Sequence, residues 1–352
     1  MRVIPPLAVT DAVLISSSIV EVAPAAHAIG TTYSAGATSS TGVIGGVITV
    51  WKSLAAGNVG HAPSSSPTWW QNIGTTYAVY DPTHSYSLDD YVIDPVAHLV
   101  YQSMIAGANL GQPLATGTAW RPAGPTNKMA AFDNLRNTQT VAPVDIVYTL
   151  APGVRTDSIA VIGLDASSVS ISVTTGGREV YAVSVALSLR KSFRWRDYFF
   201  GQFKTRKAIQ FFNLPPYRNA EITVTVHKTN GLRAVGGIIV GNAVYLGKTL
   251  AAITSDHLNF SNVERDKFGN VTLQPRRSVP KVNERVVFDK SLTSALLEVR
   301  ERLNGVPAVW SALDDFRSNN FEPTFIFGIH KEFSLDLEPS THGIITLELE
   351  EV

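Results

Sequence analysis

Residues 158–175 read SIAVIGLDASSVSISVTT, and this stretch decides the fold class. Both of its halves, SIAVIGL (158–164) and SVSISVTT (168–175), alternate with the two-residue period of a β-strand that buries one face. The second half ends at Gly176-Gly177, which is a turn signal. The stretch therefore predicts two consecutive strands.

The same pattern continues in both directions between residues 140 and 245. Turn signals such as Ala151-Pro152-Gly153 and Asn230-Gly231 separate the alternating segments. We expect seven strands, at 144–150, 158–164, 168–175, 180–187, 207–214, 220–228 and 236–246. Strands of this number and spacing are typical of a β-sandwich.

The composition excludes several classes of protein. The chain has 352 residues, 29 basic and 29 acidic side chains, and no cysteine. Its balanced charge offers no field for nucleic acid, and the lack of cysteine excludes disulfides and thiolate metal sites. No run of 18 apolar residues is present, so we expect no membrane span. Its length predicts two to four domains.

The first 28 residues resemble a secretion signal only at first sight. An apolar run ends in Ala26-His27-Ala28, but Pro5, Pro6, Asp11 and Glu21 interrupt any apolar helix. We interpret residues 1–28 as an extended arm. The protein is then made in the cytoplasm of its host cell without a signal peptide.

An internal repeat follows the arm. A shift of 50 residues places Trp51 over Tyr101, Trp70 over Trp120 and Gly74 over Gly124, while Tyr33 corresponds to Tyr86. Fixed-period similarity indicates duplicated modules. Each unit is too small for a large core, and we place the units at residues 29–76 and 77–125.

The aromatic residues of these units have two interpretations. They either form the cores of the small modules or stack on the C–H faces of sugar rings. Trp69 and Trp70 cannot both point inward from one strand, because side chains alternate along it. The candidates for sugar binding are Tyr33, Trp51, Trp69, Trp70, Tyr86, Tyr101 and Trp120.

Each repeat reads as a tyrosine, a strand that ends in an aromatic residue, a small-residue turn, a proline and a tryptophan. This pattern resembles the small chitin-binding type of carbohydrate-binding module over residues 29–125. The first copy departs from it by lacking an acidic residue after Gly36, and the second has Asp89-Asp90 without the preceding glycine. The resemblance implies a β-fold and a ligand such as host surface polysaccharide.

Residues 190–207, RKSFRWRDYFFGQFKTRK, combine seven basic residues with six aromatic residues. Such a mixture can bind single-stranded nucleic acid, but the neutral chain and the small footprint favour burial across the sandwich or a protein interface. The interface candidates are Arg194, Trp195, Tyr198, Phe199 and Phe200.

The last part of the chain, 248–352, predicts a β-rich domain with one helix. A hairpin is expected around Lys267-Phe268-Gly269-Asn270, and strands are expected at 281–288 and in the closing segments. An apolar stripe predicts a helix at 291–303, opposite a charged face. The N-terminal arm could join this domain.

Three further resemblances extend over residues 120–352. MAAFDN (129–134) and the strands after it resemble a galactose-binding, discoidin-like jelly roll at 126–247. One helix on a β-sandwich is similar to the tail-tube-like domains of phage tails. The motif order WRPAGPTNKMAAFDN, LPPY, VGNAVYLGKT, ERDKFGN and FGIHKEFS resembles a family of tailed-phage virion proteins. That family implies a place in the tail or baseplate and no defined chemistry.

No catalytic constellation is recognisable. GNAVYLGKT (241–249) has five residues between its glycines where a phosphate loop has four. The eight histidines show no metal-ligand spacing, and Asp89-Asp90 and Asp314-Asp315 fit turns better than a glycosidase pair. We expect no catalytic residue, no metal and no cofactor.

The sequence thus predicts a mainly β, multidomain chain and leaves three functions open. The first is a non-enzymatic structural component of a bacteriophage tail or baseplate, which forms a ring or trimer, contacts other virion proteins and could anchor fibres. The second is a host-adsorption protein that binds glycan through the repeats. The third is a polysaccharide depolymerase.

Overall fold

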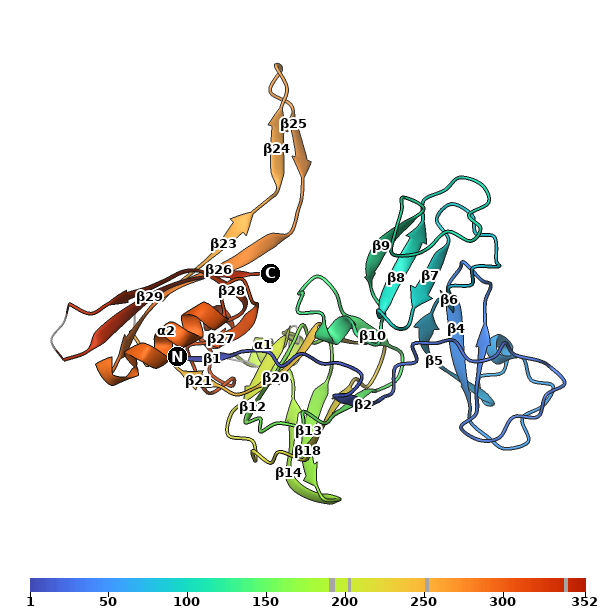
Figure 1. Cartoon of the computed structure of the whole chain (residues 1–352), viewed down its shortest axis with the longest axis horizontal. Coiled ribbons are helices and arrows are strands. Elements are labelled where there is room, and N and C mark those ends of the chain that lie inside the picture. The colour runs from blue at the N-terminus through green and yellow to red at the C-terminus, as the bar shows by residue number, and fades with distance from the viewer. Residues whose placement is uncertain (190–193, 202–203, 251–252, 339–340) are drawn as a thin grey trace.

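A computed structural model describes residues 1–189, 194–201, 204–250, 253–338 and 341–352. The chain is mainly β, as the sequence predicts, and its sheets lie in a row (Figure 1). The two repeats occupy one end of the row, the sandwich lies in the middle and the last hundred residues form the other end.

The stretch 158–175 lies at the heart of the sandwich. Its first half forms β12 (Ser158–Ile162), which is buried at every position between two neighbours. Its second half forms β13 (Ser168–Thr175), whose odd-numbered residues from Val169 to Val173 point into the core. The two halves enter different sheets, because the chain turns at Gly163.

Three sheets make up the sandwich. A five-stranded sheet runs in the order β14-β13-β18-β11-β2, a three-stranded sheet in the order β17-β12-β20, and β10 pairs with β19. Their bounds are β10 (Thr140–Ala142), β11 (Ile146–Leu150), β14 (Arg178–Ala186), β17 (Ala208–Phe211), β18 (Ala220–His227), β19 (Arg233–Val235) and β20 (Gly237–Gly241).

One predicted strand is wrong. The segment 236–246 divides into β20 and β21 (Val244–Tyr245), which belong to different sheets. β20 pairs with β12, whereas β21 pairs with β1 (Arg2–Ile4) of the arm. Apolar residues lie on both sides of Gly241-Asn242, so the two short strands resemble one long strand in the sequence.

The N-terminal arm connects the C-terminal sheet to the sandwich. Its β1 lies between β21 and β27 in the C-terminal sheet, and its β2 (Leu14–Ser17) extends the sandwich beside β11. Between them the amide of Leu7 donates to the carbonyl of Val240 at 2.8 Å. The expectation that the arm joins the C-terminal domain is confirmed for β1.

The two repeats form separate small sheets with related geometry. The first contains β3 (Thr38–Thr41), β4 (Ile48–Ser53) and β5 (Trp70–Thr76), with the 3₁₀ turn Pro63–Ser65 between β4 and β5. The second contains β6 (Ala78–Val79), β7 (Tyr91–Asp94), β8 (Leu99–Ser103) and β9 (Trp120–Pro125). Both have a β-bulge at the same place, where Gly74 and Gly124 adopt φ of 145° and 139°.

The C-terminal sheet has eight strands and one covering helix. Its order is β21-β1-β27-β28-β29-β26-β22, and β23 also pairs with β26. The helix α2 (Thr293–Arg302) lies within the predicted range 291–303 and buries Leu296 and Val299 against the sheet. The remaining bounds are β22 (Lys248–Thr249), β23 (Thr254–Asn259), β26 (Ser278–Phe288), β27 (Ala308–Ser311), β28 (Phe325–Asp336) and β29 (Gly343–Glu351).

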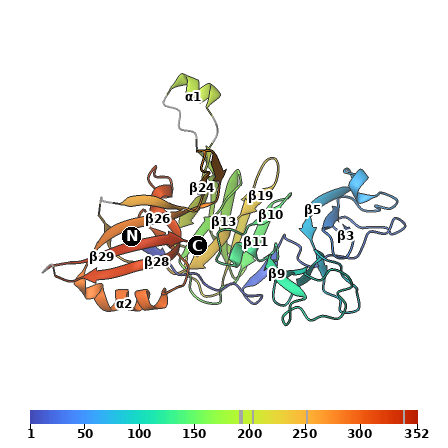
Figure 2. The same ribbon diagram turned by 90° about the horizontal axis from the view of Figure 1, so that it is seen from above.

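Two elements project from this body. One is the predicted hairpin, formed by β24 (Asn262–Arg265) and β25 (Val271–Gln274), which extends beyond β23 (Figure 1). The other is a finger above the sandwich, where β15 (Ser188–Leu189) and β16 (Lys204–Thr205) lead to α1 (Trp195–Phe200), a short helix that the sequence did not predict (Figure 2). Among the described residues, no helix has the length and apolar character needed to cross a membrane.

Candidate functional site

The repeats use most of their predicted sugar-binding aromatics as core. Trp70, Tyr86, Tyr101 and Trp120 are each at most 6% exposed. The Trp70 ring meets the Tyr33 ring edge to face at 4.9 Å, and Trp120 meets Tyr86 in the same way at 5.2 Å. Their ring faces are covered in this structure, which favours the core interpretation for these four residues.

A buried asparagine organises each repeat. Asn58 donates its side-chain amide to the Ser53 hydroxyl at 3.0 Å, and Asn109 donates in the same way to Ser103 at 3.0 Å. The main chain of Asn58 also exchanges two hydrogen bonds with Tyr33. Because Asn109 and Tyr86 make the matching pair, the two modules share one internal framework.

Three predicted aromatics keep part of their surface exposed, namely Tyr33, Trp51 and Trp69. Trp69 stacks on His61 with the ring centres 4.1 Å apart, and Tyr33 stacks on His27 at 5.4 Å. Trp70 begins β5 and is buried, whereas Trp69 lies in the turn before the strand and is only partly buried, so the adjacent tryptophans differ in burial. A sugar-stacking role therefore stays a prediction for these three residues.

A polar hub joins the repeats to the arm. The Glu21 carboxylate accepts hydrogen bonds from His98 at 2.7 Å, Thr126 at 2.6 Å and Lys128 at 3.1 Å. Burial alone would raise the pKa of Glu21, but these hydrogen bonds outweigh burial and lower the pKa from its ordinary value. The carboxylate is thus held ionised at the junction of the arm, the second repeat and the sandwich.

The main chain of Glu21 holds the first repeat. Its carbonyl accepts a hydrogen bond from the Thr76 hydroxyl at 2.5 Å. Thr76 and Thr126 are equivalent under the 50-residue repeat. One arm residue therefore fixes the same point at the end of both repeats.

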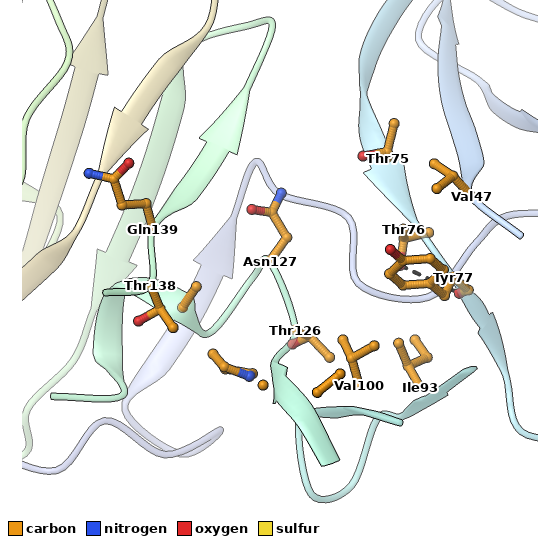
Figure 3. A pocket seen from close by; sticks show the side chains of 14 residues that line it. Val47, Thr75, Thr76, Tyr77, Ile93, Val100, Thr126, Asn127, Thr138 and Gln139 are labelled. Atoms are coloured by element: carbon orange, nitrogen blue, oxygen red, sulfur yellow. Dashed lines mark hydrogen bonds between the residues drawn. The ribbon is translucent and has the colours of Figure 1, made fainter. Parts of the chain in front are cut away.

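A junction pocket of about 370 Å³ lies beside this hub. In Figure 3, Val47, Thr75, Thr76 and Tyr77 stand on one side, and Asn127, Thr138 and Gln139 stand on the other. Ile93, Val100 and Thr126 lie below them. No carboxylate, lysine, arginine or histidine side chain lines the pocket, and the remaining lining residues are Ala123, Gly124, Pro125 and Ala130.

The polar groups of the junction pocket are held firmly. The Asn127 side chain makes two hydrogen bonds of 2.9 Å with the main chain of Val141, and the Gln139 amide donates to Gly163 at 3.1 Å. The Tyr77 ring stacks on Tyr91 at 5.2 Å. Burial, with a smaller contribution from Tyr91, raises the pKa of the Tyr77 phenol, which therefore stays protonated and can donate a hydrogen bond.

A second cleft, of about 590 Å³, separates the outer face of the first repeat from the sandwich. Lys52 and Gln71 face it from the repeat, and Asp145, His227 and Arg233 face it from the sandwich. The Asp145 carboxylate already accepts hydrogen bonds from Arg233 at 3.2 Å and His227 at 2.9 Å. The charged groups on the sandwich side of this cleft therefore already form hydrogen bonds with one another.

The interface candidates lie on the finger, away from the sandwich. Trp195, Phe199 and Phe200 are 80%, 66% and 83% exposed, and Arg194 is also exposed. The side chain of Tyr198 lies outside the described residues. The described rings do not bury a connection across the sandwich, so that expectation is wrong, and the interface interpretation stays a prediction.

The residues considered for catalysis have structural roles. Asp314 pairs with Arg2 at 3.0 Å, and the Asp315 carboxylate accepts from the amide of Arg317 at 2.9 Å. Gly241 is required because a side chain there would collide with the carbonyl of Pro5, not because it holds a phosphate. In the part of the chain that the structure describes, no cluster of histidine and acidic side chains is placed to hold a metal.

Neither the role of Glu21 as a hub nor the place of Tyr77 and Gln139 in the pocket was predicted from the sequence. Extending the repeat by two residues past Gly74 and Gly124 pairs Thr76 with Thr126, which is the one available signal. The pocket itself has no local signature, because its lining comes from several segments spread between Val47 and Gln139. No protein-family model matches the chain, and no curated protein sequence matches it either.

Proposed function

We propose that this protein is a non-enzymatic structural component of a bacteriophage tail or baseplate, which assembles with copies of itself and with other virion proteins. The observation that carries the proposal is the projecting hairpin. Almost every residue from Thr254 to Pro280 is exposed, although the strands there are regular and paired.

The hairpin is amphipathic. Val263 lies opposite Leu273, and Arg265 lies opposite Val271, so these residues share one face. Asn262, Glu264, Thr272 and Gln274 share the other face. Val263, Leu273 and Val271 are 52%, 61% and 53% exposed, and Phe268 at the tip is 79% exposed.

A monomer would gain little stability from such an exposed hairpin. A two-stranded ribbon is marginal in water without a surface to pack against, and contiguous exposed apolar residues mark interaction sites. A neighbouring subunit that covers the apolar face would remove both difficulties. Assembly through the hairpin, together with the order of motifs from residue 120 onward, supports a virion structural role.

The test has two parts. Light scattering after size-exclusion chromatography should show an oligomer, and antibody labelling of purified particles should place the chain on the tail. The variant V263S/L273S should give monomers. The variant E264S/T272S alters the opposite face at the neighbouring cross-strand pair and should leave the oligomer intact. A monomeric wild-type protein that is absent from purified particles would contradict the proposal.

A second candidate function is host-glycan adsorption by the first repeat. It is favoured by the partly exposed rings of Trp51 and Trp69. Trp51 lies on β4, and Trp69 directly precedes the neighbouring strand β5. Glycan-array binding that disappears in Trp69→Ala while the melting temperature is retained would support it. Trp70→Ala would not be informative, because Trp70 is core.

A further inference from the structure

We propose that the junction pocket, formed by Tyr77, Thr75 and Gln139 with the ends of both repeats, binds a neutral saccharide. The proposal goes beyond the assembly role. It gives the second candidate function a site different from the exposed tryptophans of the first repeat.

The lining of the pocket selects the class of ligand. About 370 Å³ falls at the lower end of the range for small-molecule pockets. Charged ligands find no counter-charge in it, because no lysine, arginine, histidine or carboxylate lines it. The tyrosine ring, hydroxyls and amide that remain match the apolar faces and hydroxyl rim of a neutral sugar.

Three polar atoms in this lining are free to bind a ligand. They are the Tyr77 hydroxyl, the Thr75 hydroxyl and the Gln139 carbonyl oxygen, none of which makes a hydrogen bond to any described residue. The Gln139 carbonyl can only accept, whereas the two hydroxyls can donate or accept. Sugar hydroxyls suit such a mixed set, because each also donates and accepts.

The pocket is preorganised, which separates it from an accidental crevice between modules. Thr76 and Thr126 both line it, and both are fixed by Glu21. Tyr91 supports the Tyr77 ring from one side, and the amide of Gln139 is tied to Gly163. Ligand binding would therefore cost little free energy for ordering the side chains that line the pocket.

The β-bulge of the second repeat contributes directly to the wall. Val100 pairs with Gly124 and Tyr101 pairs with Pro122, so Ala123 is the extra residue of the bulge. Ala123 and Gly124 both line the pocket. β9 is an edge strand of its sheet, so its main chain has a neighbouring strand on one side alone.

The experiment uses saturation-transfer NMR to detect binding of four neutral disaccharides to the full chain. The disaccharides are maltose, cellobiose, lactose and N,N′-diacetylchitobiose. We expect at least one of them to bind. Tyr77→Ala should abolish the signal, and Tyr77→Phe, which keeps the ring stack, should weaken binding about 10-fold through loss of one hydrogen bond.

Two further variants keep the result decisive. If Tyr77→Ala does not fold, the double variant T75V/Q139A removes two polar partners at exposed positions and should weaken binding at least about 10-fold. Trp69→Ala should leave the signal unchanged. Absence of transfer from all four sugars would overturn the proposal. So would a signal that survives in a folded Tyr77→Ala variant or in T75V/Q139A, or one that is lost in Trp69→Ala. Because none of these variants touches the hairpin, the assembly state tests the structural role separately.

Discussion

Thr76 and Thr126, which occupy equivalent positions in the two repeats, both donate their hydroxyl hydrogens to Glu21. Thr76 reaches the main-chain carbonyl at 2.5 Å, and Thr126 reaches the carboxylate at 2.6 Å. A duplicated module normally carries duplicated contacts to duplicated partners. Here one residue of the arm serves both copies, so the distance between the repeat ends is set by a single side chain and its own peptide.

Replacing Glu21 should loosen this junction. Glu21→Gln keeps the size of the side chain but removes the charge that accepts from His98 and Lys128. We expect the free energy of unfolding at neutral pH to fall by about 2 kcal/mol. Thermal melting followed by circular dichroism would measure the loss. Asp11→Asn is the matched control, because Asp11 contacts the same two bases but is 66% exposed.

The same residue predicts sensitivity to acid. The folded-state pKa of Glu21 lies below its ordinary value, so its stabilisation is complete above that ordinary value and is lost as the pH falls through the folded pKa. The wild-type melting temperature should therefore decrease in acid more steeply than that of Glu21→Gln. Parallel pH profiles for the two proteins would show that the hub contributes nothing.

Glu284 should have the opposite pH dependence. It is 2% exposed on β26, and neither carboxylate oxygen has a hydrogen-bond partner among the described residues. Burial raises its pKa to about 7, against a smaller opposing effect of the N-terminal ammonium. The folded state therefore holds a proton that the unfolded state loses, and this contribution to stability falls as the pH rises from 4.5 to about 7.

Glu284→Gln should flatten this dependence. Near pH 8 the variant should be more stable than the wild type by about 3 kcal/mol, because it no longer has a carboxylate to ionise. Denaturant unfolding at several pH values would measure the difference. Glu348→Gln on the neighbouring strand removes a carboxylate that is 34% exposed and paired with Lys281, and should change stability by less than about 1 kcal/mol.

The buried asparagines should act within their own repeats. Asn58→Ala and Asn109→Ala each leave a buried serine hydroxyl without its donor, at a cost of about 1–3 kcal/mol. Hydrogen exchange should show faster opening of β3–β5 in the first variant and of β7–β9 in the second. Equal acceleration in both repeats would mean that the modules unfold as one unit.

The adjacent tryptophans should differ sharply. Trp70 is 2% exposed and donates its indole N–H to His61 at 2.9 Å, so Trp70→Ala should destabilise the first repeat by about 3–5 kcal/mol. Trp69 keeps an exposed surface, and Trp69→Ala should cost far less. Melting temperatures of the two variants would compare them, and similar losses would contradict the assignment of Trp69 to the outer face.

The sequence predicted the features that depend on local periodicity. Alternation identified β13 and β18, the apolar stripe identified α2, and the turn residues around Gly269 identified the hairpin. It failed at 236–246, where apolar residues continued past Gly241-Asn242 while the chain passed from one sheet to another. Side-chain periodicity reports which face is buried, and it carries no information about which strand lies alongside.

The candidate sites divide in the same way. The sequence by itself determined that aromatic residues recur at equivalent places in two small β modules, because a duplicated core leaves a duplicated pattern. Only the tertiary structure decided that Trp70 and Trp120 are covered and that Tyr77 and Gln139, 62 positions apart in the numbering, face one pocket. Burial and pocket formation depend on packing between segments that are far apart in the chain, and the local spacing of residues does not specify such packing.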